Sequence, residues 1–197
     1  MQAPLIGGHP AVDFLNTSFT PEGEVIETIE DGRSLLNWFV GAGLLDEFAA
    51  AKLSKRFGAK AIDTTALEAR KLREWAKEWL LRWRAKPNGD YTDELGYLNK
   101  LLARGTSRHE VIESEQGLSL VERPNIDSPD ALLTLIAMQV AALITQTPPS
   151  LVKSCAGHKC SLWFVDRTKA HRRMFCSAAA CGNRAKVAAF RQRQKEE

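Results

Sequence analysis

Residues 155–181 read CAGHKCSLWFVDRTKAHRRMFCSAAAC, and they hold all four cysteines of the 197-residue chain. The spacing is C-x4-C, then fifteen residues, then C-x4-C. Two close pairs of thiolates, brought together by a hairpin, supply the tetrahedral ligand set that zinc prefers. A redox pair would favour C-x-x-C beside a βαβ pattern, which is missing here, and a reducing cytosol disfavours disulfides. The stretch predicts a zinc site made of Cys155, Cys160, Cys176 and Cys181.

The number of thiols also indicates the kind of site. A catalytic zinc keeps one ligand position open for water, and four thiolates leave none. We therefore expect one structural zinc per chain. His158 and His171 lie close enough in the sequence to replace a cysteine, although the four cysteines already complete the ligand shell.

The residues around the cysteines predict a small zinc module, treble-clef-like or ribbon-like. Residues 162–165 and 172–175 are typical of two short strands, with 166–170 as the turn between them. Ser177 can cap a helix that runs from Ala178 to about Lys195. A module of this size seldom folds on a core alone, so the metal is its main organising element.

Charge divides the chain at the same place as the cysteines do. Residues 151–197 hold 11 Lys and Arg against 3 acidic residues, whereas residues 1–150 hold 16 against 21. Pro148 and Pro149 separate the two parts. We expect a domain over residues 1–147, which folds without the tail, and a zinc module over residues 151–197.

The body is predicted to be mostly helical. Periodicity and cap residues favour helices at 33–39 behind Asp31, at 45–56, at 63–86 capped by Thr64 and Thr65, at 93–104, and after Ser128. Residues 10–16 fit a helix start or a strand, 23–28 an edge strand, and 110–113 with 118–122 a hairpin. Trp75, Trp79 and Trp83 form one stripe, which could line a pocket or a dimer seam, although a core face is the favoured interpretation. The fold class is mainly α with a small antiparallel β element (α+β).

Both ends of the chain carry a family resemblance. The tail segments LWFVDRT (162–168), HRRMFCS (171–177) and CGNRAK (181–186) resemble the CGNR zinc-finger family. The opening segment GHPAVDFLNT (8–17) is similar to the start of the ABATE domain that precedes this finger in the family. The first pair here reads CAGHKC, where the family often has an Asn-Pro-Asp type of turn. The resemblance implies that the four cysteines bind zinc, and it implies a bacterial, stress-linked transcription regulator.

The basic residues of the tail point to a polyanion. A net positive module attracts phosphates through counterion release, so DNA is the leading partner, with RNA a lesser one. We expect Val187 and Phe190 to pack on the hairpin, which places the cations of the last helix on its two flanks. A solvated surface is the plainer alternative, and Arg184 and Asn183 could instead brace the zinc site. The predicted contacts are Arg167, Lys169, Arg172, Arg173, Arg184, Lys186, Arg191, Arg193 and Lys195.

The body would supply the second input of a regulator, by sensing a small-molecule ligand or by forming a homodimer. His9, Asp13, Asn16 and Thr17 could converge on a polar ligand, although tying down neighbouring backbone is the plainer role. Signatures of catalysis are missing, so no catalytic residue is predicted and an enzyme is a minority hypothesis. The main alternative to DNA binding is an adaptor whose zinc module docks an acidic protein.

Two stretches of the sequence bear on the cellular location of the protein. Residues 1–17 lack the pattern of a secretory signal. The most apolar run, residues 132–144, is shorter than the roughly 20 residues that span a bilayer. We expect a cytoplasmic protein without membrane contact.

Overall fold

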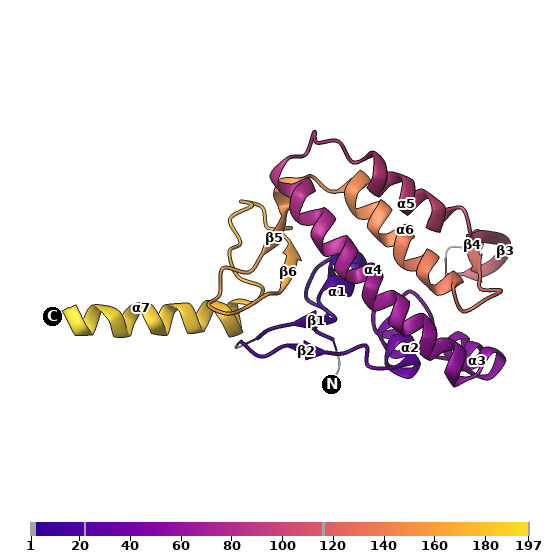
Figure 1. Ribbon diagram of the computed structural model, residues 1–197, viewed down its shortest axis with the longest axis horizontal. Coiled ribbons are helices and arrows are strands. Elements are labelled where there is room, and N and C mark those ends of the chain that lie inside the picture. The colour runs from indigo at the N-terminus through magenta and orange to yellow at the C-terminus, as the bar shows by residue number, and fades with distance from the viewer. Residues whose placement is uncertain (1–2, 22, 116, 197) are drawn as a thin grey trace.

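The computed structural model describes residues 3–21, 23–115 and 117–196 (Figure 1). A helical body surrounds the long central helix α4, and a small zinc module lies beside it, close to the C-terminal end of α4. The helices of the body are α1 (Pro10–Leu15), α2 (Gly32–Gly41), α3 (Glu47–Phe57), α4 (Ala59–Ala85), α5 (Thr92–Leu102) and α6 (Ala131–Gln146). The mainly helical α+β class is confirmed. Within the described residues, no helix has both the length and the hydropathy needed to span a bilayer.

The core of the body lies between α4 and its neighbours α2, α6 and α1. Trp79 and Trp83 are buried on the inner face of α4, and Trp75 is partly buried with its ring 4.7 Å from that of Tyr97. Helix α6 is apolar on almost every side, and it buries Leu132 and seven further residues. The tryptophan stripe is therefore a core face, as the favoured interpretation predicted.

Helix starts follow local hydrogen bonds. Asp31 caps α2 in a capping box, since its Oδ1 accepts from the Ser34 N–H at 2.8 Å and the Ser34 Oγ accepts from the Asp31 N–H at 2.9 Å. Helix α4 begins at Ala59, earlier than predicted, because Gly58 at φ 76° lets the chain pass directly from α3 into α4. Thr64 and Thr65 therefore lie inside the helix and cap nothing.

The start of α6 also differs from its prediction. The helix begins at Ala131, after Asp130, rather than behind a Ser128 cap. Ser128 contributes its backbone carbonyl, which accepts from the Ala131 N–H at 3.1 Å. Helix α6 is therefore preceded by Pro129 and by a turn of backbone hydrogen bonds, and none of the described side chains caps it.

The described residues form three two-stranded antiparallel sheets. Strand β1 (Ser18–Phe19) pairs with β2 (Ile26–Glu27) beside the zinc module. Strands β3 (Thr106–Ser114) and β4 (Gly117–Asn125) form the predicted hairpin, which is longer than the sequence pattern indicated.

The third sheet corrects a prediction. Strand β6 (Trp163–Val165) pairs with β5 (Val152–Ser154) and not with residues 172–175, which form a loop. The turn of this hairpin is therefore the first cysteine pair itself. The loop stays out of the sheet because the buried Asp166 carboxylate accepts the Arg173 backbone N–H at 2.8 Å.

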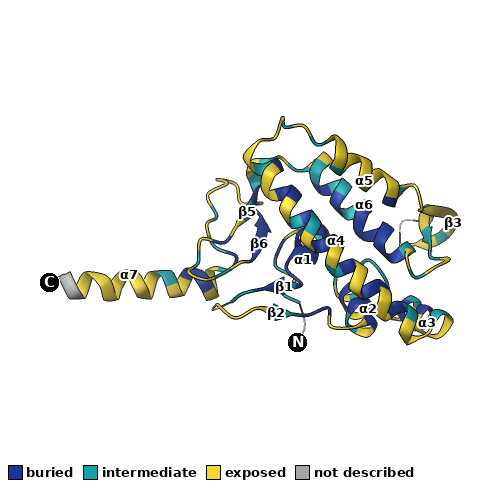
Figure 2. Ribbon diagram, in the orientation of Figure 1, coloured by how far each residue is buried: buried dark blue, intermediate teal, exposed yellow. Residues whose placement is uncertain are grey.

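The zinc module and the body share their cores. Val152, Trp163 and Val165 of the module belong to the main core of the body. Phe19 and Ile26 of the body pack in turn against the buried cysteines, in a second, smaller core. Figure 2 shows β6 buried where the two parts meet, whereas β5 passes from the buried Val152 to the exposed Ser154.

The last helix, α7 (Asn183–Glu196), extends from the zinc module away from the body (Figures 1 and 2). Val187 and Phe190 are 49% and 54% exposed, so the prediction that they pack on the hairpin is wrong. The reason is that Trp163 and Val165 face the body core and Phe164 faces the zinc core, which leaves the hairpin no apolar surface for α7.

Candidate metal centre and basic surface

The four cysteine thiols meet at one point. Their Sγ atoms all lie within 4.8 Å of one another, with Cys160 and Cys176 3.9 Å apart and Cys176 and Cys181 3.6 Å apart. A zinc–sulfur distance of about 2.3 Å in a tetrahedron gives sulfur–sulfur edges of about 3.8 Å. The donor set and its spacing fit one structural zinc, held by Cys155, Cys160, Cys176 and Cys181.

The first cysteine pair forms a tight turn in spite of its departure from the frequent family pattern. The Gly157 N–H donates to the Cys155 Sγ at 3.3 Å, and the Cys160 N–H donates to the Gly157 carbonyl at 3.1 Å. A Cβ on Gly157 would lie 2.9 Å from the Cys181 Sγ, so only glycine fits at this position. Lys159 adopts a positive φ of 58° and completes the turn.

The cluster shifts the pKa values of three of its thiols, two of them upward and one downward. Burial, together with the neighbouring thiols, raises the pKa of Cys160 to about 11 and raises that of Cys176 further. Burial acts on Cys181 in the same direction, but a hydrogen bond from Arg184 and contacts with the other thiols outweigh it and lower the pKa of Cys181. Zinc binding would therefore release protons and remove the cost of crowding four thiols in a buried cluster.

The histidines take other positions. His158 is exposed, and the Nδ1 of His171 lies 3.3 Å from the Asp166 carbonyl oxygen. Within the described part of the chain, the metal-ligating cluster consists of the four cysteines.

Asp166 organises the loop between the two cysteine pairs, a role that the sequence analysis missed. Its buried carboxylate accepts from the Lys153 Nζ at 2.6 Å, from the Thr168 Oγ1 at 2.6 Å and from two backbone N–H groups. Burial alone would raise the pKa of Asp166, but the hydrogen bonds from Lys153, Thr168 and Arg173 hold this pKa well below its usual range. The D-x-T pattern is typical of a side-chain turn and could have signalled this role.

Two of the nine predicted nucleic-acid contacts brace the zinc module. Arg184 donates from Nη2 to the Cys181 Sγ at 3.0 Å and to the Pro21 carbonyl at 3.4 Å. The Arg173 guanidinium lies 4.2 Å over the Phe164 ring and donates to the carbonyls of Phe175 and Cys176. The contacts of Arg184 match the bracing alternative, whereas Arg173 was not part of that alternative.

Of the other seven predicted contacts, six are exposed. None of these six makes an ion pair with another residue that the structure describes. The side chain of Lys195 lies outside the described residues. The exposed cations are Arg167, Lys169 and Arg172 on the loop and Lys186, Arg191 and Arg193 on α7.

The four polar residues of the opening segment hydrogen bond to the protein itself. His9 accepts the Ala11 N–H as the cap of α1 at 3.1 Å, and Asp13 accepts the Gly7 N–H at 2.7 Å. Thr17 donates to the Phe14 carbonyl at 2.7 Å and accepts from Arg73 at 3.0 Å.

Asn16 links the opening segment to the zinc module. Its Oδ1 accepts the Trp163 N–H at 2.8 Å, and its Nδ2 donates to the Trp163 carbonyl at 2.9 Å. These contacts are those of the plainer role, in which the side chains tie down backbone. A ligand at His9, Asp13, Asn16 and Thr17 stays a prediction.

A separate cavity in the body, of about 370 Å³, was missed at the sequence level. It lies between α5, α6 and the β3–β4 hairpin. Leu102, Leu135 and Met138 give it an apolar wall, while Ser107 and Glu122 give it a polar rim. Residues from three different elements line the cavity, so no local sequence pattern predicts it.

Comparison with known protein families identifies both parts of the chain. Residues 8–147 match the model of the ABATE family, described as "Putative stress-induced transcription regulator". Residues 152–194 match the model of the CGNR zinc finger. No curated protein matches the chain. The two matches confirm the resemblance seen in the opening segment and in the tail, and they follow each other in the predicted order.

Proposed function

The chain belongs to the ABATE family and ends in a CGNR zinc finger, and we propose that it is a transcription regulator that binds DNA through this zinc module. The observation that carries the proposal is a projecting basic helix. Helix α7 leaves the module with Lys186, Arg191 and Arg193 exposed. Its 14 residues correspond to a length of about 21 Å, and the major groove of B-DNA admits an α-helix.

Zinc has a defined task in this proposal. An isolated helix of this length is marginally stable in water, because nucleation is costly. Here the turn before α7 contains Cys181, and the Ser177 Oγ accepts the Ala180 N–H at 3.3 Å as its cap. Metal ligation at Cys176 and Cys181 therefore fixes where the helix starts and which way it points. The ordering cost then does not fall on the binding step.

The test is DNA binding by zinc-loaded full-length protein. Selection from a random duplex library gives the best site, and fluorescence anisotropy then gives affinity as a function of salt. Arg191→Ala and Arg193→Ala are each expected to weaken binding on all sequences and to reduce the salt slope by about 1. Gln194→Ala, also on α7, is the uncharged control.

Two outcomes would contradict the proposal. If apo and zinc-loaded protein bind with the same affinity and salt slope, the metal does not orient the helix. If zinc-loaded protein binds no duplex at low salt, DNA is not the partner. Binding to polyglutamate at equal salt would then favour the adaptor that docks an acidic protein.

We propose that the body senses a small molecule with an apolar part and a polar end in the cavity between α5, α6 and the hairpin. Its volume of about 370 Å³ is within the range of ligand pockets, and its lining combines apolar and polar groups. The dye 1-anilinonaphthalene-8-sulfonate is a first probe, because its fluorescence rises in apolar cavities. Met138→Glu is expected to remove that rise, and Leu81→Glu, on the exposed face of α4, is the control. If Asp13→Asn removes the rise and Met138→Glu does not, the ligand binds at the opening segment instead.

A further inference from the structure

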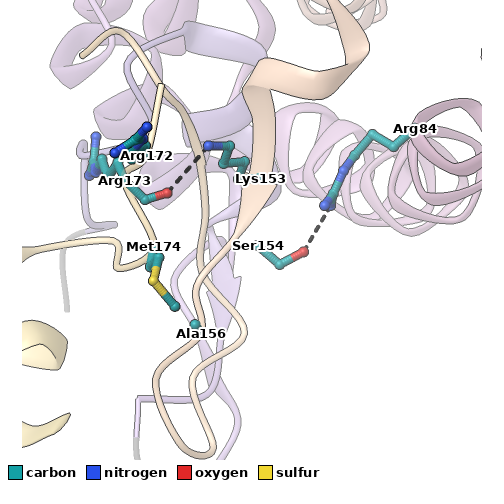
Figure 3. A pocket seen from close by; sticks show the side chains of 7 residues that line it. All are labelled: Arg84, Lys153, Ser154, Ala156, Arg172, Arg173 and Met174. Atoms are coloured by element: carbon teal, nitrogen blue, oxygen red, sulfur yellow. Dashed lines mark hydrogen bonds between the residues drawn. The ribbon is translucent and has the colours of Figure 1, made fainter. Parts of the chain in front are cut away.

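A basic depression lies where the C-terminal end of α4 meets the zinc module (Figure 3). Its volume is about 540 Å³, and four of its seven lining residues are cations: Arg84, Lys153, Arg172 and Arg173. Among the described residues, no acidic side chain lines it. Arg84 comes from the body, whereas the other three cations come from the zinc module.

Two of these cations are engaged inside the module. The Lys153 Nζ bonds the Asp166 carboxylate at 2.6 Å and the His171 carbonyl at 2.7 Å. Arg173 donates to two backbone carbonyls and stacks on Phe164. They add positive potential to the depression, but these contacts hold both side chains against the module.

Arg84 is held in position without a counter-ion. Its guanidinium lies 4.6 Å over the Trp163 ring, and its Nη1 donates to the Ser154 Oγ at 2.8 Å. No carboxylate among the described residues forms an ion pair with it. A half-buried guanidinium is costly unless an anion compensates it, and burial does lower the pKa of Arg84. Its remaining donors can serve such an anion, because a guanidinium carries five N–H groups in a fixed plane.

Arg172 faces the same depression from the other wall. Figure 3 shows Arg84 on one side and Arg172 on the other, with Lys153 and Ser154 between them. Arg172 is exposed and makes no ion pair with a described residue. Two guanidinium groups on opposite walls are suited to an anion with several acceptor oxygens, and a phosphate is the usual one.

We propose that this depression seats a backbone phosphate of the DNA duplex between Arg84 and Arg172. The body then takes part directly in DNA binding, alongside α7. The inference rests on the proposed function. The openness of the site favours a phosphate on a passing polymer, because Arg172 and Met174 on one wall are exposed, whereas a small-molecule pocket buries most of its ligand.

The test measures affinity and salt slope for the selected duplex with zinc-loaded full-length variants. Arg84→Gln and Arg172→Gln are each expected to weaken binding about tenfold and to reduce the salt slope by about 1. Arg70→Gln is the matched control, because it removes the same charge from α4 about 21 Å away from Arg84. Arg172 is exposed, so its variant keeps the proposal testable if Arg84→Gln unfolds, which melting curves will show.

The outcomes separate this inference from the proposed function. If Arg84→Gln and Arg172→Gln bind like Arg70→Gln while Arg191→Gln binds weakly, the phosphate seat is wrong and DNA binding by α7 stands. If the wild-type protein binds no duplex, the proposed function fails and this inference fails with it. Inorganic pyrophosphate tests the other source of phosphate. If micromolar pyrophosphate raises the melting temperature of the wild type and not that of Arg84→Gln, a small molecule is the ligand and the assignment to DNA is overturned.

Discussion

Replacing Asn16 by alanine is expected to weaken the joint between the body and the zinc module. The Asn16 side chain is 1% exposed and pairs with both backbone polar groups of Trp163, at 2.8 Å and 2.9 Å. Trp163 lies in β6 and packs into the core of the body. The Asn16 side chain thus makes the two hydrogen bonds with Trp163 that a neighbouring strand would otherwise make with β6.

The expected loss follows from the two groups that would be left without partners. A buried backbone group that loses its hydrogen bond costs about 1–3 kcal/mol, so Asn16→Ala is expected to lower the free energy of unfolding by about 2–6 kcal/mol. For a chain of this size, 1 kcal/mol shifts the melting temperature by about 2–4 °C. A loss near the middle of that range, about 4 kcal/mol, corresponds to a shift of about 8–16 °C. Asn16→Asp is expected to lower the free energy of unfolding at least as much, because a carboxylate oxygen would face the Trp163 carbonyl.

Urea unfolding followed by tryptophan fluorescence measures the free energy directly. Asn99→Ala, on the exposed face of α5, is the matched control and is expected to change it by less than about 0.5 kcal/mol. Equal effects of Asn16→Ala and Asn99→Ala would refute the reasoning, because the two hydrogen bonds would then contribute nothing to the joint. The same variant tests the ligand hypothesis for this segment, since a ligand residue can be removed without a large loss of stability.

Four further outcomes are expected. Elemental analysis should find about one zinc per chain in the wild type and a loss of it in Cys176→Ser; a folded, zinc-free module would contradict the site. Arg184→Gln should release zinc to a chelator at least about tenfold faster than Lys186→Gln, its neighbour on α7, because it removes a hydrogen bond to a zinc ligand. Burial, with a smaller effect of a nearby arginine, lowers the pKa of His9 below its ordinary value of about 6.5. The stability that the neutral ring contributes as the cap of α1 is therefore fully present above that ordinary value and is lost as the pH falls from there through the lowered pKa. Between about pH 7.5 and pH 5.5, the melting temperature of the wild type should therefore fall more than that of His9→Asn. Equal falls would exclude a role of the neutral His9 ring as the cap of α1. A chain that ends at Thr147 should keep a cooperative transition at a lower urea midpoint, because the module fills part of the body core; loss of cooperativity would mean that the body needs the module to fold.

Much of the fold could be predicted because its signals are local. Apolar periodicity marked the helices of the body, with Asp31 as a correct cap residue, and the spacing of the cysteines marked the zinc site. The caps predicted at Thr64, Thr65 and Ser128 were wrong, because Gly58 and a backbone turn start those helices. The remaining errors came where tertiary contacts decide. Strand β6 takes β5 as its partner because Asp166 holds the following loop away, and α7 stands free because the body has already covered the apolar side of the hairpin.

The candidate sites divide in the same way. The metal ligands were predictable, since four thiols in two pairs allow few other arrangements. The roles of single cations were not, because whether Arg184 meets a phosphate or the Cys181 sulfur depends on the position of the Pro21 loop. Arg84 could not be found from the sequence either. It is one of several arginines on a long helix, and only its position over Trp163 distinguishes it.

The contacts between the body and the module bear on how the two proposed DNA-binding elements, α7 and the basic depression, would act together. Asn16 binds β6, Thr20 exchanges two hydrogen bonds with Ser161, and the Pro21 carbonyl accepts from Arg184 next to the zinc cluster. The start of α7 and the wall that carries Arg84 are therefore joined to one packed unit and not to a flexible linker. If both elements bind DNA as proposed, their phosphates must lie at a fixed separation along the duplex. A pre-set separation reduces the ordering cost of binding, and it limits the duplex shapes that satisfy both elements at once.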